Sequence, residues 1–279
     1  MPFPDLTDTP LDDLLRLDGR IAVVTGGALG IGRAICRRFS EAGATVVLAD
    51  VNDAAASASA EAIAAETGGR VDATHVDVRD TATVDRLAEH VLSLHGRFDI
   101  WVNNAGIFPP TDFLGSGDED WDRVLEINVR GAYAGSRAAA RHMIERGGGG
   151  VILNLTSVNS YRAFGPSIPH YTASKHACYG ITKALAVELG PHGIRVNYFN
   201  ADFVDTPLMR KLISERARRR GVTDEAQADD YRRRNALGVG PIPPRAVAEA
   251  ALFLCSPRAA YTTGGVLTID GGIKEAMPR

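Results

Sequence analysis

A glycine-rich segment between an apolar run and a helical run constrains the fold of this chain most. Residues 25–32 read T-G-G-A-L-G-I-G; they follow the apolar residues 21–24 and precede an amphipathic segment that starts at Arg33. This order predicts a strand, a tight turn and a helix whose first N–H groups lack acceptors within the helix. Glycine lets the backbone approach a ligand closely, and a helix N-terminus attracts anions. The segment therefore predicts a site for a nucleotide pyrophosphate, although ordinary turns also use glycine and the spacing differs from G-x-G-x-x-G.

An acidic residue about twenty positions later supports a dinucleotide site. Residues 45–49 are mostly apolar and end at Asp50, which predicts a second buried strand with a carboxylate at its end. In dinucleotide-binding folds this position accepts hydrogen bonds from the adenosine ribose. A carboxylate there repels a 2′-phosphate, so NAD is favoured over NADP. The alternative is a surface residue that caps the next helix, a role for which Asp53 would serve as well.

The rest of the chain repeats the strand-and-helix alternation. Strand-like runs lie at residues 21–25, 45–49, 71–77, 99–102, 150–156, 194–199 and 265–269, with helical patterns between them. This order predicts an α/β fold of the Rossmann type, a doubly wound parallel sheet of about seven strands with helices on both faces. With 45% apolar residues in a chain of 279, and no Ser/Pro-rich linker, we expect a single domain over residues 19–279 after an N-terminal extension over residues 1–18.

Composition argues against several other classes of protein. The formal net charge of −3 gives no general attraction to nucleic acid, and no apolar run is long enough to suggest a membrane span. The cysteines Cys36, Cys178 and Cys255 are scattered, and the histidines form no ligand pattern with them, so neither a disulfide framework nor a metal site is expected. Residues 1–18 lack the apolar core of a signal peptide, and we expect a cytoplasmic protein.

Candidate catalytic residues lie in the second half of the chain. Tyr171 and Lys175 begin a helical pattern that continues to Leu189, and a spacing of four places both side chains on one helix face. A phenol has a reference pKa of about 10, and a nearby ammonium or an oxidised nicotinamide would lower it toward a useful range. This spacing is common by chance, but Ser157 closes the apolar run 151–156, at the sheet edge where α/β proteins bind ligands. The alternative for Ser157 is a turn serine that satisfies local backbone groups.

These motifs, taken in order, resemble those of the short-chain dehydrogenase/reductase family, single-domain and NAD(P)(H)-dependent. The resemblance runs from about Leu17 to Gly272. It rests on the glycine turn at 25–32, Asp77-Val78, N-N-A-G at 103–106, Asn128 within I-N-V-R-G, Ser157, Tyr171 with Lys175, and I-D-G-G at 269–272.

The resemblance implies roles for four catalytic positions. Tyr171 matches the acid/base, and Lys175 matches the residue that lowers its pKa and binds the nicotinamide ribose. Ser157 matches the serine that orients the substrate, and Asn128 matches the residue that holds a water between Lys175 and solvent.

The resemblance also implies cofactor contacts and an assembly. Asp77 and Val78 match adenine contacts, whereas Val204 and Thr206 match contacts to the nicotinamide carboxamide. The full set of expected cofactor residues is Gly26, Leu29, Gly30, Ile31, Gly32, Asp50, Asp77, Val78, Asn104, Ala105, Gly106, Tyr171, Lys175, Val204 and Thr206. Family members are usually dimers or tetramers, so a homodimer or homotetramer is implied.

Two departures from the family pattern concern the substrate side. Fourteen positions separate Ser157 from Tyr171 where the family commonly has thirteen, so the connecting loop is one residue longer. Ala201-Asp202 replaces the usual Pro-Gly beside the nicotinamide, which removes a fixed φ and a permissive glycine. Asp202 either points its charge at the nicotinamide or fills a turn, facing solvent or a backbone N–H.

The expected activity is hydride transfer between NAD and a hydrophobic or cyclic secondary alcohol or ketone. The expected substrate wall is apolar and aromatic; it comprises Phe108, Pro109, Asn159, Tyr161, Phe164, Phe203, Leu208, Met209 and Leu212. Residues 205–237 are long and polar and are expected to form a mobile helical lid, with Leu208, Met209 and Leu212 inward and the arginines outward.

Two alternatives stay open at this point. One is an epimerase or dehydratase that uses transient oxidation, although such relatives generally have a larger C-terminal substrate domain. The other is a non-catalytic cofactor sensor or scaffold on the same fold, against which the complete Ser/Tyr/Lys/Asn set argues.

Overall fold

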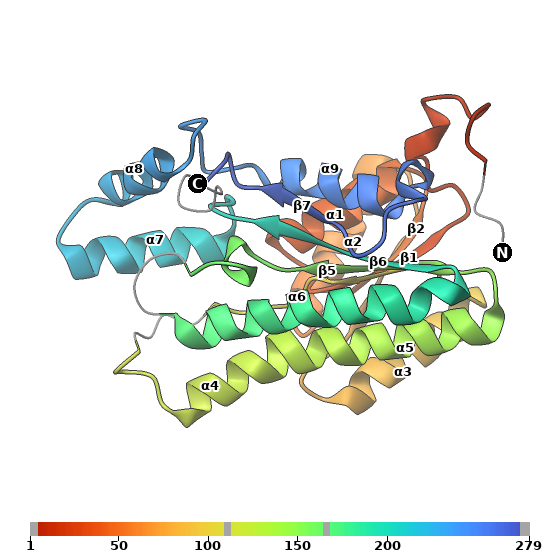
Figure 1. Cartoon of the computed structure of the whole chain (residues 1–279), viewed down its shortest axis with the longest axis horizontal. Coiled ribbons are helices and arrows are strands. Elements are labelled where there is room, and N and C mark those ends of the chain that lie inside the picture. The colour runs from red at the N-terminus through yellow and green to blue at the C-terminus, as the bar shows by residue number, and fades with distance from the viewer. Residues whose placement is uncertain (1–4, 109–112, 164–167, 274–279) are drawn as a thin grey trace.

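The sheet of this protein has seven parallel strands, which confirms the predicted architecture. The structure, a computed structural model, describes residues 5–108, 113–163 and 168–273 (Figure 1). The strands lie in the order β3-β2-β1-β4-β5-β6-β7, and each pairs with its neighbours in parallel. Their bounds are β1 (Ile21–Thr25), β2 (Thr45–Asp50), β3 (Val71–His75), β4 (Ile100–Asn103), β5 (Gly150–Leu155), β6 (Ile194–Ala201) and β7 (Val266–Ile269). The predicted strands therefore all form, with ends shifted by one or two residues.

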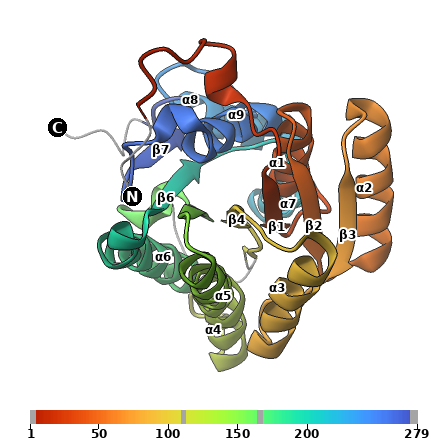
Figure 2. The same ribbon diagram turned by 90° about the vertical axis from the view of Figure 1, so that its right-hand side faces the viewer.

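Helices cover both faces of the sheet, as Figure 2 shows along its edge. One face carries α1 (Gly30–Glu41), α2 (Asp53–Thr67) and α9 (Pro244–Cys255), and the other carries α3 (Thr81–His95), α5 (Gly131–Arg146) and α6 (Pro169–Leu189). Successive strand residues serve the two cores in turn: Val23 packs into the core under α3 and α5, whereas Val24 packs into the core under α1. A parallel sheet buried on both sides needs such continuous apolar strands.

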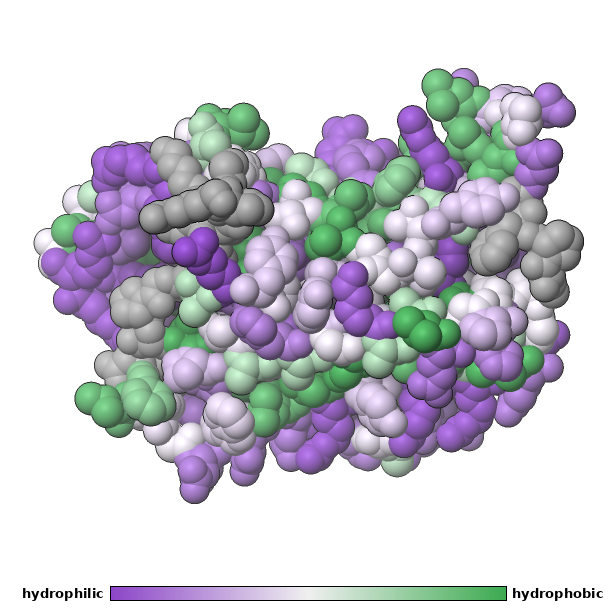
Figure 3. Space-filling model, viewed as in Figure 1, coloured by the Kyte–Doolittle hydropathy of each residue, from purple (hydrophilic) through white to green (hydrophobic). Residues whose placement is uncertain are grey.

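Three further helices, and short 3-10 segments such as Asp13–Leu15, occur in the part of the chain that the structure describes. The helix α4 (Asp118–Leu125) runs through a π-helical turn at Glu126–Arg130 into α5, and α7 (Pro207–Arg220) packs beside α8 (Asp224–Arg234). Among the described residues, no helix combines the length and the apolar character that crossing a membrane would require. The face formed by α5 and α6 presents apolar side chains among charged ones (Figure 3), and Tyr133, Ile144 and Val187 are exposed on these two helices.

The strand order places a crevice at the centre of the sheet. The chain adds β2 and β3 on one side of β1 and then β4 to β7 on the other. The connections after β1 and β4 therefore diverge to opposite faces, and the space between them lies at the carboxyl ends of the strands. The residues that line the two cavities described below gather at this edge.

Candidate active site

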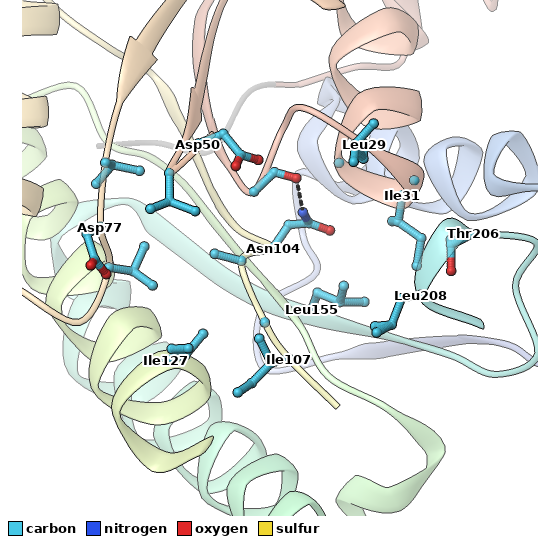
Figure 4. A pocket seen from close by; sticks show the side chains of 18 of the residues that line it. Leu29, Ile31, Asp50, Asp77, Asn104, Ile107, Ile127, Leu155, Thr206 and Leu208 are labelled. Atoms are coloured by element: carbon cyan, nitrogen blue, oxygen red, sulfur yellow. Dashed lines mark hydrogen bonds between the residues drawn. The ribbon is translucent and has the colours of Figure 1, made fainter. Parts of the chain in front are cut away.

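A cleft of about 410 Å³ lies at the carboxyl ends of β1, β2 and β4 (Figure 4). Gly26 has a φ of +65°, and a Cβ atom at Gly32 would lie 2.1 Å from the Gly26 carbonyl oxygen. Only glycine fits these two positions, and their packing brings the backbone against the cleft. The residue before α1 is Leu29, whose side chain has no acceptor, so the first N–H groups of α1 stay open to an anion. The cradle suits a pyrophosphate.

Asp50 lies at the end of β2 beside this turn. Its carboxylate accepts hydrogen bonds from the backbone N–H groups of Ala28, at 3.1 Å, and Asn52, at 3.0 Å. These bonds fix the carboxylate on the wall of the cleft. Further along the wall, Asp77 and Val78 follow β3, where an adenine contact is expected.

Arg79 lines the same part of the cleft and was not anticipated from the sequence. Its guanidinium binds both carboxylate oxygens of Asp77, with contacts from 2.5 to 3.0 Å, and holds the pKa of Asp77 below its ordinary value. Arg79 and Asp77 are two residues apart, so the sequence could have indicated that they form an ion pair. It could not have indicated that this ion pair faces the cleft.

Asn104 joins the glycine turn to the end of β4. Its Nδ2 donates to the carbonyl oxygen of Gly26, at 2.9 Å (Figure 4), and to that of Thr25, at 3.0 Å. Ala105 and Gly106 continue the wall from there. All of the expected cofactor residues up to Gly106 therefore lie on or beside one cleft, and Thr206 closes its far side.

A second cavity of about 140 Å³ adjoins the cleft and holds the candidate catalytic side chains. Ser157, Tyr171 and Lys175 all line it. Ser157 lies just after β5, and its Oγ accepts hydrogen bonds from the backbone N–H and the Nδ2 of Asn159, both at 3.3 Å. Tyr171 and Lys175 lie one turn apart on α6, and the Lys175 Nζ is 5.6 Å from the centre of the Tyr171 ring.

Burial acts against charge on both members of this pair. Burial raises the pKa of the Tyr171 phenol above its ordinary value; a hydrogen bond with Ser157 opposes the shift, and the charge of Asp202 adds to it. Burial lowers the pKa of the Lys175 ammonium, which donates to the Leu155 carbonyl oxygen at 3.2 Å. A bound cationic nicotinamide would oppose the shift at Tyr171, since an adjacent positive charge favours a phenolate.

Asn128 occupies the π-helical turn between α4 and α5. Its Oδ1 accepts from the Ile107 N–H at 2.9 Å, and its Nδ2 donates to the Ile107 carbonyl at 3.1 Å and to the Ser174 Oγ at 3.1 Å. A Cβ atom added at Gly106 would lie 3.3 Å from the Asn128 Oδ1 and 3.7 Å from the Lys175 Nζ. The two groups thus flank Gly106, and π-helical turns of this kind often occur at functional sites.

Most of the expected substrate residues line the second cavity, but not all of them. Phe108, Asn159, Phe203, Leu208, Met209 and Leu212 lie on its wall, as does Val204 from the cofactor set. Tyr161 does not; its side chain is 41% exposed and its hydroxyl bonds to the Thr268 Oγ1 at 3.1 Å, so we no longer assign it to the wall. The expectations for Pro109 and Phe164 lie outside the described residues.

The Ala201-Asp202 departure changes the cavity wall. Asp202 lines the second cavity and not the nucleotide cleft. Its carboxylate accepts from the Phe203 N–H, as the turn interpretation requires, and burial raises its pKa to about 6. The left-handed backbone falls on Phe203, at φ +49°, and not on the residue that replaces the family glycine. This conformation costs a bulky side chain about 1–2 kcal/mol, and the Phe203 ring stacks on Tyr231 with centroids 4.8 Å apart.

The expected lid contains the two helices α7 and α8, and two arginines in it, Arg216 and Arg234, lie over the Tyr231 ring instead of pointing outward. Arg216 lies over the rings of Phe108, at 5.8 Å, and Tyr231, at 5.9 Å, and donates a hydrogen bond to the Tyr231 hydroxyl. The prediction that the lid arginines face outward is wrong for Arg216 and Arg234, because aromatic faces attract their guanidinium groups. Leu212 is buried as expected, whereas Leu208 is 48% exposed although it lines the cavity.

Comparisons with known proteins agree with this geometry. A family model described as enoyl-(acyl carrier protein) reductase matches residues 26–274. The chain is 40% identical to (+)-borneol dehydrogenase 2 of Salvia officinalis, over 95% of this chain and 93% of that protein. It is 38% identical to 3beta-hydroxysteroid dehydrogenase 2 of Eggerthella lenta, over 92% and 95% of the two chains. A solved gluconate 5-dehydrogenase from Burkholderia cenocepacia, in complex with NADP and tartrate, superposes with a TM-score of 0.86 at 33% identity, over 95% of this chain and 99% of that one.

The fold, the site and these similarities define one class of protein. The chain belongs to the short-chain dehydrogenase/reductase family. It is an oxidoreductase that acts on alcohol or carbonyl groups with a nicotinamide cofactor.

Proposed function

We propose that this protein is an NAD-dependent dehydrogenase of hydrophobic or cyclic secondary alcohols, or a reductase of the corresponding ketones. The observation that carries the proposal is one small cavity, mostly apolar, in which Ser157, Tyr171 and Lys175 meet beside the nucleotide cleft. Its wall of leucine, methionine and phenylalanine side chains favours an apolar carbon skeleton. The borneol and hydroxysteroid dehydrogenases among its relatives are named for alcohols with such skeletons.

The protein's own residues would orient the substrate and move the proton. When bound in the cleft, the nicotinamide supplies or accepts the hydride. The Tyr171 hydroxyl exchanges a proton with the substrate oxygen, and the Ser157 hydroxyl holds that oxygen in place. The Lys175 ammonium stabilises a Tyr171 phenolate through its charge, and Asn128 holds the loop at Ile107 against α6.

The preference for NAD is supported by the fixed carboxylate of Asp50. Two backbone N–H groups hold it on the cleft wall, where it would accept hydrogen bonds from ribose hydroxyls and repel a 2′-phosphate. Arg79, the arginine on this wall, is bound to Asp77. The similar gluconate 5-dehydrogenase holds NADP, so the cofactor has to be measured for this chain.

The test is a comparison of kcat/KM for NAD and NADP with a panel of secondary alcohols, followed at the nicotinamide absorbance. We expect the wild-type protein to favour NAD at least about tenfold, since a like-charge contact costs more than about 1.4 kcal/mol in such a site. Asp50→Ala should narrow this ratio. Equal efficiency with the two cofactors in the wild-type protein would contradict the assignment, and no turnover of any alcohol would contradict the activity.

We also propose that the protein is a homodimer or homotetramer that assembles through α5 and α6. Exposed apolar side chains on these helices support it, chiefly Val187, Tyr133 and Ile144. Sedimentation of the wild-type protein and of Val187→Arg tests this, because a charge in an apolar interface would shift the population toward monomer. A location in the cytoplasm stays a prediction from the sequence.

A further inference from the structure

The Asp202 carboxylate lies on the wall of the substrate cavity, together with Tyr171. The charge of Asp202 acts on Tyr171 and on Tyr231, a ring of the lid, whereas Asp202 does not line the nucleotide cleft. The cavity measures about 140 Å³, and a cavity of about 150 Å³ holds a single benzene molecule. A ligand that fills so small a space lies within reach of Asp202, which lines it.

The hydrogen-bond capacity of Asp202 is mostly unused. An ionised carboxylate offers about four acceptor positions, and this one accepts from the Phe203 N–H. Among the described residues, no side chain donates a hydrogen bond to it or forms an ion pair within 4 Å of it. Other polar groups on the wall are engaged: Thr156 donates to the Phe199 carbonyl and to Asn200, and Thr206 accepts from the Met209 N–H. Asp202 is partly exposed and lines the cavity, so its open acceptor positions are available to a donor on a ligand.

The charges around Asp202 indicate what kind of group it receives. Arg216 and Arg234 attract the charge of Asp202 and Asp270 repels it, but among the described residues that line the cavity the other charged side chain is Lys175. A substrate carboxylate would meet repulsion from Asp202 at the wall. A substrate ammonium would be attracted by Asp202 but repelled by Lys175 on the same wall. A neutral hydroxyl group donates to a carboxylate and meets neither repulsion.

We propose that Asp202 selects substrates that carry a second hydroxyl group, by accepting a hydrogen bond from it while the reacting oxygen lies at Tyr171. The favoured substrates would then be cyclic diols or hydroxyketones with an otherwise apolar skeleton. This inference rests on the proposed dehydrogenase function, and it assigns a specificity role to the residue that replaces the family glycine.

The test compares matched alcohols on matched variants. Cyclohexanol, the three positional cyclohexanediols and 2-aminocyclohexanol are each assayed for kcat/KM with NAD and for Kd to the enzyme–NADH complex by calorimetry. In the wild-type protein the kcat/KM of the best diol should exceed that of cyclohexanol about tenfold or more, because a hydrogen bond to a charged group contributes that much binding free energy. Asp202→Leu, which keeps the shape and removes the acceptors, should bring this ratio to about one, and Asp202→Asn should lie between. Asp205→Asn is the control, since Asp205 binds Arg210 at 2.6 Å outside the cavity and its loss should leave the ratio unchanged.

Each result decides the question. The inference is overturned if the kcat/KM of the best diol relative to cyclohexanol is the same in the wild-type protein and in Asp202→Leu. It is also overturned if this ratio is one in the wild-type protein, or if the wild-type protein prefers the amino alcohol. If no alcohol is oxidised, the proposed function fails and the Kd comparison alone decides the role of Asp202. If Asp202→Leu does not melt cooperatively in the presence of NADH, the variant is not folded. The fall in the diol-to-cyclohexanol ratio from the wild-type protein to Asp202→Asn then decides the role of Asp202.

Discussion

The catalytic side chains sit where the fold opposes their charged forms. Burial raises the pKa of Tyr171 and lowers that of Lys175, so neither charge is favoured by the protein alone. A phenol with a raised pKa retains its proton, which suits a group that donates to a ketone oxygen. Deprotonation of Tyr171 for alcohol oxidation therefore needs the positive charges that accompany the bound oxidised cofactor.

This arrangement predicts the effect of removing the phenol oxygen. Tyr171→Phe should lower kcat at least about 100-fold, because the proton transfer is lost, while the Kd for NAD changes less than about twofold. Single-turnover rates and fluorescence titration of the cofactor measure the two quantities. Tyr161→Phe is the control, since its hydroxyl bonds to Thr268 outside the cavity and its loss should leave kcat unchanged. Retention of more than a few per cent of kcat in Tyr171→Phe would assign the proton transfer to another residue.

Asp202 predicts a pH-dependent cost in stability. Burial raises the pKa of its carboxyl from 3.8 to about 6, so the folded protein retains the proton through a range in which the unfolded chain releases it. Stability from this group therefore falls as the pH rises from about 4 to 6 and stays lower above that range, by at most about 3 kcal/mol. Asp202→Asn should raise the melting temperature by several degrees at pH 7.5 and leave it unchanged at pH 4. The same melting temperature for both proteins at pH 7.5 would show that the buried charge costs nothing.

At the scale of elements, the sequence predicted best what depends on local pattern. All seven strands followed from short strand-like runs, and α6 (Pro169–Leu189) extends two residues before the predicted start at Tyr171. The π-helical turn at Asn128 was not predictable, because it depends on hydrogen bonds to the main chain of Ile107, about twenty residues away. The replacement of Pro-Gly by Ala201-Asp202 was visible in the sequence. The positive φ at Phe203, the next residue, was not, because Phe203 stacks on Tyr231, which is distant in the sequence.

The helices α7 and α8 form the expected lid, which is predicted to move when ligands bind. Their core against the rest of the protein is a small cluster of Phe203, Ile213, Ala228 and Tyr231, and so few buried apolar contacts give little resistance to local opening. Trypsin cleavage within residues 207–234 should therefore be several-fold slower with NADH and a bound alcohol than without ligands. Tyr231→Ala, which removes the stack on Phe203, should speed cleavage in the ligand-free protein. Equal rates with and without ligands would contradict closure of a lid.

At the scale of the whole molecule, the residues of the active site and a residue that stabilises the sheet lie at opposite edges of the sheet. The site gathers at the carboxyl ends of the strands, whereas Asp99 anchors their amino ends. Its side chain is almost fully buried, and its carboxylate accepts from the Ile21 N–H at 2.9 Å and from the Arg146 Nη1 at 2.8 Å. Its own N–H and carbonyl oxygen bond to the main chain at Ile21 and Val151. One residue therefore joins β1, β4, β5 and the end of α5.

This separation predicts that stability can be lost without loss of specificity. Asp99→Ala should lower the free energy of unfolding by about 3 kcal/mol, because it leaves the Ile21 N–H without its acceptor and the Arg146 guanidinium without its paired carboxylate. Urea denaturation measures this loss, and Asp85→Ala is the control, because Asp85 pairs with Arg137 at 3.8 Å on the surface and such pairs contribute about 0–1 kcal/mol. The Kd for NAD and the preference between alcohols should be unchanged in folded Asp99→Ala, since no cavity-lining residue contacts Asp99 in its hydrogen-bond network. A change in either quantity would mean that the two edges of the sheet are coupled, and that the amino-end anchor also sets the geometry of the site.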